Sequence, residues 1–237
     1  MPTRTEQKIW YLKQIFHGSD DLIRDIERVT HMQDMSKNQL IAGPEINCGK
    51  IFILKKGSVN VYQVYNGKKI ILDTLAPGDI FGDIRNVGNQ NAPSDNCREM
   101  PFVEAREDSI ISIAQSRDIY RIMQKYPDVA ISLLQNLSNQ LLRAESKIQD
   151  LALRSVSERI VRELSRIAEK TGENLPDRYV IDHPITHEQL AMMVGATRET
   201  VTKALSSLRS RGLVNIQNNK YSIFKQIAQP SFRTRVG

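Results

Sequence analysis

The feature of the sequence that most constrains its fold is a strict heptad pattern of apolar residues in its second half. The pattern begins at Ala130 and ends at Leu151, and its steps alternate between four and three residues. Its members are Ala130, Leu134, Leu137, Leu141, Ala144, Ile148 and Leu151. This spacing is typical of the seam between two long helices, whereas a helix buried in a core shows looser spacing. We therefore predict a long helix that pairs with a second copy of the chain, with a buried core helix as the alternative.

Short β-type runs precede this helix, between about Met35 and Ile113. One run covers residues 51–54, and another, over 58–65, is followed by Asn66-Gly67. An Asn-Gly pair between two such runs predicts a tight hairpin, because both residues tolerate the positive φ of a type I′ turn. Pro77-Gly78-Asp79 predicts a further turn. Many short strands with glycine turns predict a small roll or barrel, which follows a helical region over residues 5–31.

The formal net charge of +6 is concentrated at the C-terminal end of the chain. Residues 1–150 contain 19 Lys/Arg and 19 Asp/Glu, whereas residues 151–237 contain 14 Lys/Arg and 8 Asp/Glu. A basic region beside a neutral one is typical of proteins that bind the phosphate backbone of DNA. A basic surface without any such partner explains the charge equally well.

Residues 185–205 have the layout of a helix-turn-helix. Thr186 is a good N-cap for a first short helix, Gly195 lies where a turn needs a positive φ, and Thr197 caps a second helix. The second helix has an apolar inward face and an outward face that carries Arg198, Glu199, Thr202 and Lys203. Arginine donates two hydrogen bonds to guanine and glutamate accepts from cytosine N4, so this face suits a major groove. An ordinary polar face on a surface helix is the competing interpretation.

Behind this helix, two β-type runs over residues 212–216 and 221–224 flank the polar residues 217–220. This pattern predicts a hairpin of the kind called a wing, in which Lys220 either touches phosphate or is solvated. Ser155 is a candidate N-cap for a helix over 156–170, which predicts a bend after the long helix. The predicted domains are residues 1–115, 116–153 and 154–237.

Several classes of protein are disfavoured by the composition. No apolar run approaches the roughly 20 residues of a membrane span, and no signal-peptide segment follows the polar N-terminus, so we expect a cytoplasmic protein without a membrane partner. The two cysteines, Cys48 and Cys97, are too few for a four-thiolate zinc or iron–sulfur site. Between Met32 and Asp182 there is no histidine for a metal or haem, and no nucleotide-binding or nucleophile motif occurs. We therefore expect no catalytic residue, metal or cofactor.

In order along the chain, these segments resemble the cAMP receptor protein / fumarate-and-nitrate regulator (Crp/Fnr) superfamily of bacterial transcription factors. The most specific matches lie at 185–186, 194–201 and 212–214, and the roll matches at 56–59 and 77–83. The resemblance implies an α+β fold with an N-terminal β-roll of the cyclic-nucleotide-binding type, a long dimerisation helix and a C-terminal winged helix-turn-helix. It also implies a homodimer that binds double-stranded DNA and contacts RNA polymerase, and it leaves activation and repression open.

The resemblance also implies a set of DNA-binding residues, which are Arg198, Glu199, Lys203, Thr197, Thr186, Thr200 and Thr202. Arg198 and Glu199 would read bases in a palindrome with TGTGA-like half-sites, and Thr186 and Thr197 would contact phosphate at helix starts. Lys203 departs from the cAMP receptor protein, which has an arginine there. A lysine ammonium is a point charge and not a bidentate fork, so the readout of that base should differ.

The effector side departs further from the cyclic-nucleotide members. Gly82-Asp83 stands where they have Gly-Glu, Arg98 is followed by Glu99 where they have Ser or Thr, and Ala144-Glu145 replaces their Thr-Ser pair. Because Glu99 offsets the charge of Arg98, we expect DNA binding without cAMP. The candidate effector residues are Gly82, Asp83 and Arg98, and the candidate redox residues are Cys48 and Cys97. Control by cAMP or by thiol oxidation is the alternative within the family, and an interaction module without DNA binding is the alternative outside it.

Overall fold

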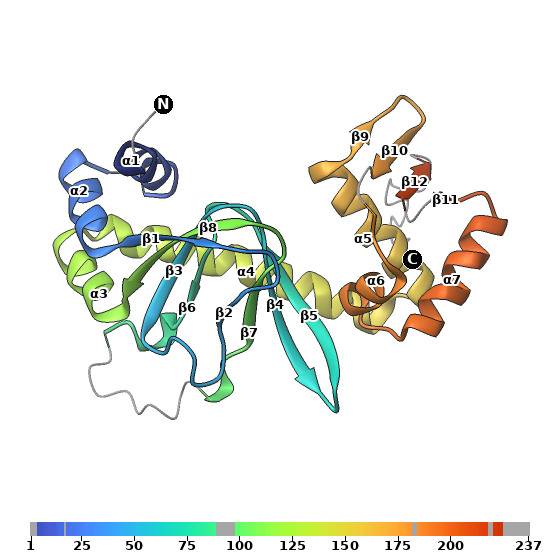
Figure 1. The fold of residues 1–237 in the computed structure, drawn as a ribbon, viewed down its shortest axis with the longest axis horizontal. Coiled ribbons are helices and arrows are strands. Elements are labelled where there is room, and N and C mark those ends of the chain that lie inside the picture. Colours follow the sequence, from blue (N-terminus) through green and yellow to red (C-terminus); the bar gives the residue numbers. More distant parts are fainter. Residues whose placement is uncertain (1–3, 17, 89–97, 182–183, 218–219, 225–237) are drawn as a thin grey trace, which may run out of the picture. The chain divides into compact units, whose positions relative to one another are not determined.

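The computed structural model describes residues 4–16, 18–88, 98–181, 184–217 and 220–224, which fold into two compact units (Figure 1). The first unit comprises Met1–Tyr65 and Leu72–Ala144, and the second comprises Asn66–Ile71 and Glu145–Gly237. The division in the second half of the chain falls inside one long helix, α4 (Asp128–Leu153). In the described ranges, no helix combines the length and the apolar character needed to cross a membrane.

Two four-stranded sheets form the roll of the first unit, which confirms the fold class predicted for this region. One sheet has the strand order β1-β8-β3-β6, and the other has the order β2-β7-β4-β5. The strands are β1 (His31–Met35), β2 (Leu40–Ala42), β3 (Lys50–Lys56), β4 (Val59–Tyr65), β5 (Lys68–Leu75), β6 (Ile80–Gly82), β7 (Phe102–Ala105) and β8 (Ser109–Gln115). The segment from Gly88 to Pro101, for which the sequence predicts no element, includes residues 89–97 outside the described part.

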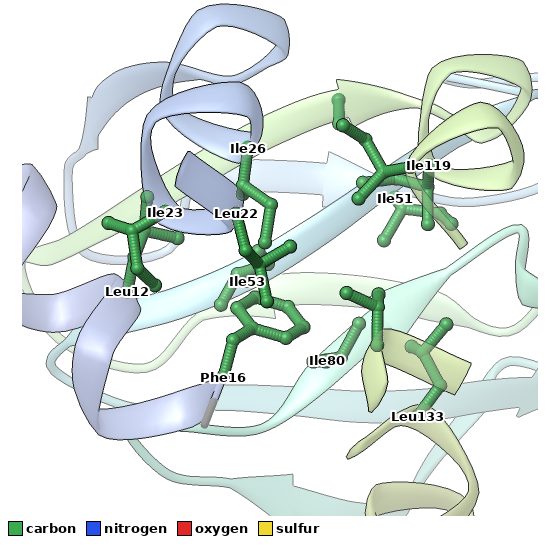
Figure 2. Packing of buried hydrophobic residues seen from close by; sticks show 13 residues of the cluster. Leu12, Phe16, Leu22, Ile23, Ile26, Ile51, Ile53, Ile80, Ile119 and Leu133 are labelled. Carbon is green, nitrogen blue, oxygen red and sulfur yellow. The ribbon is translucent and has the colours of Figure 1, made fainter. Parts of the chain in front are cut away.

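The core of the roll is organised around β3, both faces of which are buried. Phe52 and Leu54 belong to a cluster between the two sheets, whereas Ile51 and Ile53 belong to a second cluster that contains the helices. Successive side chains of a strand point to opposite faces, so a strand buried on both faces needs an unbroken apolar run. Figure 2 shows this second cluster, in which β3 meets side chains from the N-terminal helices, from the helix over Ser116–Lys125 and from α4, including Leu12, Leu22, Ile26, Ile119 and Leu133.

Helix boundaries in the first unit follow from local capping. The predicted helical region 5–31 is two helices, α1 (Arg4–Ile15) and α2 (Asp20–Val29), and β1 begins where that region was expected to end. Ser19 starts α2 by accepting a hydrogen bond from the Leu22 N–H at 3.3 Å, and the Thr30 hydroxyl closes its last turn on the Ile26 carbonyl at 2.8 Å. A short 3-10 helix, η1 (Ile84–Asn86), follows β6, and α3 (Ser116–Lys125) precedes α4.

The predicted hairpin and the predicted bend both occur. Asn66 and Gly67 have φ values of 49° and 74°, which are the left-handed conformations that a type I′ turn needs. Ser155 begins α5 (Val156–Thr171) with a capping box, because its hydroxyl accepts from the Glu158 N–H while the Glu158 carboxylate accepts from the Ser155 N–H. This cap ends α4 and sets the start of the helix that follows.

The second unit is a winged helix-turn-helix, as the sequence predicts. It contains α5, α6 (His187–Val194), α7 (Arg198–Ser210) and a sheet of order β11-β12-β10-β9. Its strands are β9 (Glu173–Asn174), β10 (Arg178–Ile181), β11 (Val214–Gln217) and β12 (Lys220–Phe224). The strands β9 and β10 are additional to the predicted elements, and the wing tip at 218–219 lies outside the described residues. The core contains Leu164, Leu190, Val201, Leu205 and Tyr221, all at most 1% exposed.

Candidate nucleic-acid interface

The first turns of α7 present a row of exposed polar side chains. Val201, Leu205 and Leu208 are buried against the rest of the second unit. A helix repeats every 3.6 residues, so burial of this stripe turns the residues between its members outward. The exposed side chains are Arg198, Glu199, Thr202 and Lys203, with Thr197 and Thr200 exposed beside them. The structure therefore brings together, at one helix end, six of the seven residues that the resemblance implies for DNA binding.

Two threonine caps and one glycine define the ends of α6 and the start of α7. Thr186, the seventh residue of the set, accepts from the Gln189 N–H at 3.1 Å in a capping box, and Thr197 accepts from the Thr200 N–H at 3.2 Å. Gly195 ends α6 with φ 64° and ψ 49°, a left-handed conformation that favours glycine. A Cβ at Gly195 would lie 3.0 Å from Leu151 Cδ2, so a side chain there would also be crowded.

A hydrogen bond between side chains joins α6 to α7. His187 Nδ1 lies 2.9 Å from Thr202 Oγ1, and the Thr202 hydroxyl donates to the Arg198 carbonyl oxygen, also at 2.9 Å. His187 is the first residue of α6 and was not among the predicted site residues. No sequence pattern identifies this contact, because the two side chains are 15 positions apart and meet only through the turn between the helices.

The electrostatics at the start of α7 suit recognition of DNA. The N–H of Glu199 itself and the Thr197 hydroxyl hold the pKa of the Glu199 carboxyl below its ordinary value, so it is ionised at neutral pH. A carboxylate in this state accepts hydrogen bonds only, which is the property needed to receive cytosine N4–H. The exposed cations Arg198 and Lys203 and the positive end of the α7 dipole favour phosphate.

The wing is fastened to the start of α6 by a buried tyrosine. Tyr221 in β12 is fully buried, and its hydroxyl donates to the Ile185 carbonyl oxygen at 3.1 Å. Burial raises the pKa of this phenol, so it remains a neutral donor. The neighbouring Lys220 is exposed at the beginning of the same strand. The orientation of the wing is therefore coupled to the position of the first helix of the motif.

The candidate effector residues of the roll take part in contacts within the roll. Asp83 is 1% exposed and accepts from the Gly49 N–H at 3.0 Å and from Asn86 Nδ2 at 2.9 and 2.8 Å. It follows Gly82, the last residue of β6. Arg98 is exposed and pairs with Glu45 at 3.3 Å. Of the candidate redox residues, Cys48 is a half-buried free thiol and Cys97 lies outside the described residues. The carboxylate of Asp83 thus stabilises the turn that follows β6.

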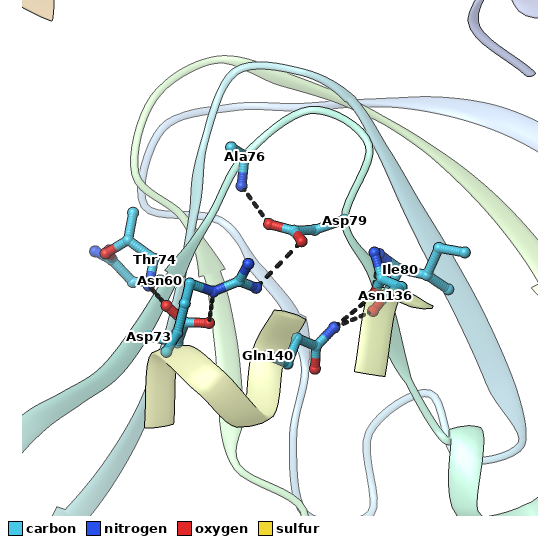
Figure 3. Close-up of polar contacts among 9 residues, drawn as sticks. Asn60, Asp73, Thr74, Ala76, Asp79, Ile80, Asn136 and Gln140 are labelled. Atoms are coloured by element: carbon cyan, nitrogen blue, oxygen red, sulfur yellow. Dashed lines mark hydrogen bonds and ion pairs between the residues drawn. The ribbon is translucent and has the colours of Figure 1, made fainter. Parts of the chain in front are cut away.

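Side chains of α4 hold the turn between β5 and β6 within the first unit (Figure 3). Arg143 pairs with Asp73 at 2.8 Å and with Asp79 at 3.1 Å. One turn earlier, Gln140 donates to the Ile80 carbonyl at 2.7 Å, and Asn136 accepts from the Ile80 N–H at 3.2 Å. We call Arg143, Gln140, Asn136, Asp73 and Asp79 the α4–roll network. It was not predicted, because its partners are 56 to 70 residues apart in sequence.

A β-roll, a long helix and a winged helix-turn-helix with an exposed, cationic second helix together define a DNA-binding transcription regulator. The sequence comparison agrees: residues 158–226 match the Crp-like helix-turn-helix domain, and residues 33–126 match the cyclic nucleotide-binding domain. The chain belongs to the Crp/Fnr superfamily, and it is a transcription regulator rather than an enzyme.

Curated relatives are similar in sequence to this chain over most of their length. The chain is 27% identical to the global nitrogen regulator of Synechocystis sp. over 198 residues, and this aligned region covers 83% of this chain and 86% of the relative. It is 25% identical over 177 residues to the CRP-like cAMP-activated global transcriptional regulator of Mycobacterium tuberculosis, covering 73% and 75% of the two chains.

Solved structures show the same fold. The c-di-GMP responsive global regulator CLP of Xanthomonas campestris has a TM-score of 0.73 at 17% identity and covers 87% of this chain and 99% of its own. A mutant of CooA from Carboxydothermus hydrogenoformans has a TM-score of 0.70 at 22% identity, and the match covers 94% of this chain and 96% of the CooA chain.

Proposed function

We propose that this protein regulates transcription as a homodimer that binds a palindromic DNA site and needs no small-molecule effector. The observation that carries the proposal is the exposed Arg198-Glu199 pair at the N-terminal end of α7. In helix-turn-helix proteins, this end of the second helix enters the major groove most deeply. The cited relatives are a global nitrogen regulator and a global transcriptional regulator, and the basic surplus of the chain lies in residues 151–237, which include this helix.

The half-site is proposed to be similar to TGTGA. Arg198 would donate to O6 and N7 of guanine, and the ionised Glu199 would accept from cytosine N4 on the other strand, which is supported by the exposure of both side chains. Lys203 reaches a guanine or a phosphate as a point charge, so its base should be read less strictly than by an arginine. Thr186, Thr197 and Thr200 lie at the two helix starts, where backbone N–H groups attract phosphate.

The second copy of the chain is proposed to pair along the exposed apolar face of α4. Leu134 is 64% exposed, Leu141 is 60% exposed and Ile148 is 65% exposed in the single chain. These are every seventh residue, so they form one stripe along the helix and satisfy the pattern of a two-helix seam. Their exposure favours the seam over the core-helix interpretation. Pairing of two α4 helices would bring two copies of α7 to successive major grooves about 34 Å apart.

Independence from an effector is proposed from the contacts that the roll makes with its own chain. The α4–roll network bonds α4 to the turn at 76–80, and Asp83 and Arg98 are engaged by Gly49, Asn86 and Glu45. A ligand shifts a protein between two states only if it binds one of them more tightly than the other. Here the internal contacts already stabilise one arrangement of α4 on the roll, so we infer that no ligand is needed to select it. At the promoter, the dimer would recruit or block RNA polymerase, and its chromosomal target agrees with a cytoplasmic location.

The proposal is tested by fluorescence anisotropy with the full-length protein and a duplex that carries two TGTGA-like half-sites. The protein is titrated onto the duplex in three conditions: without additive, with cAMP and with a thiol oxidant. Cyclic AMP is chosen because the Mycobacterium tuberculosis relative is named as cAMP-activated. We expect tight binding in all three conditions. Binding that requires cAMP or oxidation would overturn effector independence.

Two arginine variants test the recognition helix in the same assay. Arg198→Ala should lose preference for the palindrome over a scrambled duplex. Arg121→Ala is the matched control, because Arg121 is an exposed arginine of α3 whose partner, Asp118, lies on the same helix. Preferential binding retained by Arg198→Ala would exclude α7 as the reading element. A protein that prefers neither duplex would refute the proposed half-site, and it would then be tested against a randomised library.

A further inference from the structure

The hydroxyl group of Thr202 is occupied within the protein, although its side chain is exposed on the outward face of α7. A threonine hydroxyl has one hydrogen to donate and two lone pairs that accept. The hydrogen is donated to the Arg198 carbonyl oxygen at 2.9 Å, one turn earlier in the same helix. The oxygen also lies 2.9 Å from His187 Nδ1 on α6.

The roles in the second contact follow from the first. Since the Thr202 hydrogen points to Arg198, the Thr202 oxygen is the acceptor for His187, and Nδ1 carries the hydrogen. The hydroxyl is therefore held from two directions, by its own helix and by α6. Rotation about the Cα–Cβ bond would break both bonds, so the γ-methyl group has a fixed direction as well.

We propose that Thr202 reads a thymine in the half-site through its methyl group. Thymine alone presents a C5-methyl group in the major groove, and a threonine methyl is one of the apolar groups that contact it. The Thr202 hydroxyl can donate to a base only by giving up its bond to the Arg198 carbonyl oxygen, because it has a single hydrogen. Its second lone pair is the one hydroxyl position left for a base, whereas the methyl group takes part in neither internal hydrogen bond. The inference rests on the proposed function, because it needs α7 to be the helix that enters the groove.

The position of Thr202 also limits which base it reads. Thr202 follows Arg198 by four residues on the same face, which is about 6 Å along the helix axis. Base pairs are stacked about 3.4 Å apart. The thymine therefore lies within about two steps of the base pair that Arg198 contacts, on either strand.

The test begins with a DNA site chosen by the protein itself. The full-length protein selects duplexes from a randomised library, and each thymine of the selected half-site is then replaced by deoxyuridine, which lacks only the methyl group. At one thymine position of the half-site, we expect the replacement in a single half-site to weaken binding about fourfold, which is the effect of one buried methyl. The same replacement in both half-sites should weaken binding about fifteenfold. A library that yields no enriched sequence would refute the proposed function itself. An enriched site at which no methyl contributes would refute only this inference.

Two nearly isosteric variants separate the methyl group from the hydroxyl. Thr202→Ser keeps the hydroxyl and removes the methyl, so it should bind the thymine and deoxyuridine duplexes equally. Its affinity for the deoxyuridine duplex should stay within about twofold of the unmodified protein, which also shows that the variant is folded. Thr202→Val keeps a methyl and removes the hydroxyl. Because branching at Cβ still restricts χ1 of valine in a helix, the variant should still prefer thymine. Discrimination that survives in Thr202→Ser, or that is lost in Thr202→Val, would overturn the assignment.

Discussion

At the scale of single residues, a side chain of α7 can contribute to DNA binding through its charge, through its hydrogen-bonding geometry, or through both. Arg198 contributes both, because a guanidinium is a cation and also a planar fork that matches guanine. We expect Arg198→Lys to keep the salt dependence of DNA binding but to lose about 1–3 kcal/mol of preference for the selected base. Anisotropy titrations at several salt concentrations, with the selected duplex and with single-base variants, measure both quantities.

Arg198→Ala provides the comparison, because it removes the charge as well as the fork. It should show the same loss of preference and, in addition, a salt slope smaller by about one unit. If Arg198→Lys retained full base preference, Arg198 would be a phosphate contact and not a base reader.

Residue-scale features of the site were predictable where their cause is local in sequence. Thr186 and Thr197 cap their helices by hydrogen bonds to a group three positions away, and this spacing can be read directly from the chain. The occupied hydroxyl of Thr202 was not predictable, since one of its partners, His187, belongs to another helix. Chemistry that depends on a tertiary contact becomes visible only when the fold places the two groups together.

At the scale of elements, the α4–roll network uses a small number of side chains to bind α4 to the roll. Arg143 is two-thirds buried and faces two carboxylates, so its removal leaves Asp73 and Asp79 without this cation. We expect Arg143→Met to lower the free energy of unfolding by about 1–2 kcal/mol, after allowing for partial solvent exposure. Urea denaturation followed by circular dichroism measures the change.

Arg121→Met is the control for this substitution. Arg121 makes a single exposed ion pair within α3, so its loss should change the free energy of unfolding by less than about 0.5 kcal/mol. Equal effects of the two variants would show that the network stabilises no more than a surface ion pair does. In that case, the contacts of α4 would not support binding without an effector.

Most elements were predictable because periodicity and caps agree with the fold. The short runs of the roll, the caps Ser155, Thr186 and Thr197 and the strict spacing on α4 each predict an element that the structure contains. The strands β9 and β10 have a weaker pattern, since only Tyr179-Val180-Ile181 forms a β-type run before Pro184. Strand β10 is stabilised by pairing with β12, about 40 residues later, so its pattern alone is not diagnostic.

At the scale of the whole molecule, the apolar stripe on α4 connects the fold to the proposed palindrome. A palindromic site matches two-fold protein symmetry, and in a parallel seam each Leu141 meets Leu141 of the second copy. Leu141→Glu would place two carboxylates against each other there. Because Leu141 is 60% exposed in the single chain, the substitution should leave each protomer folded. We expect this variant to be a monomer of 27.0 kDa in sedimentation analysis, whereas the unmodified protein, as the proposed dimer, should have twice that mass.

The loss of the proposed dimer should also abolish preference for the palindrome, although every residue proposed to contact DNA is unchanged. One copy of α7 reads one half-site only, so the second half-site no longer raises the affinity. Asn139→Glu is the control, because it adds the same charge to an exposed position of α4 outside the seam and should remain dimeric. A dimer that persists in Leu141→Glu would place the interface elsewhere. A monomer that keeps its preference for the palindrome would show that recognition does not need the paired helices.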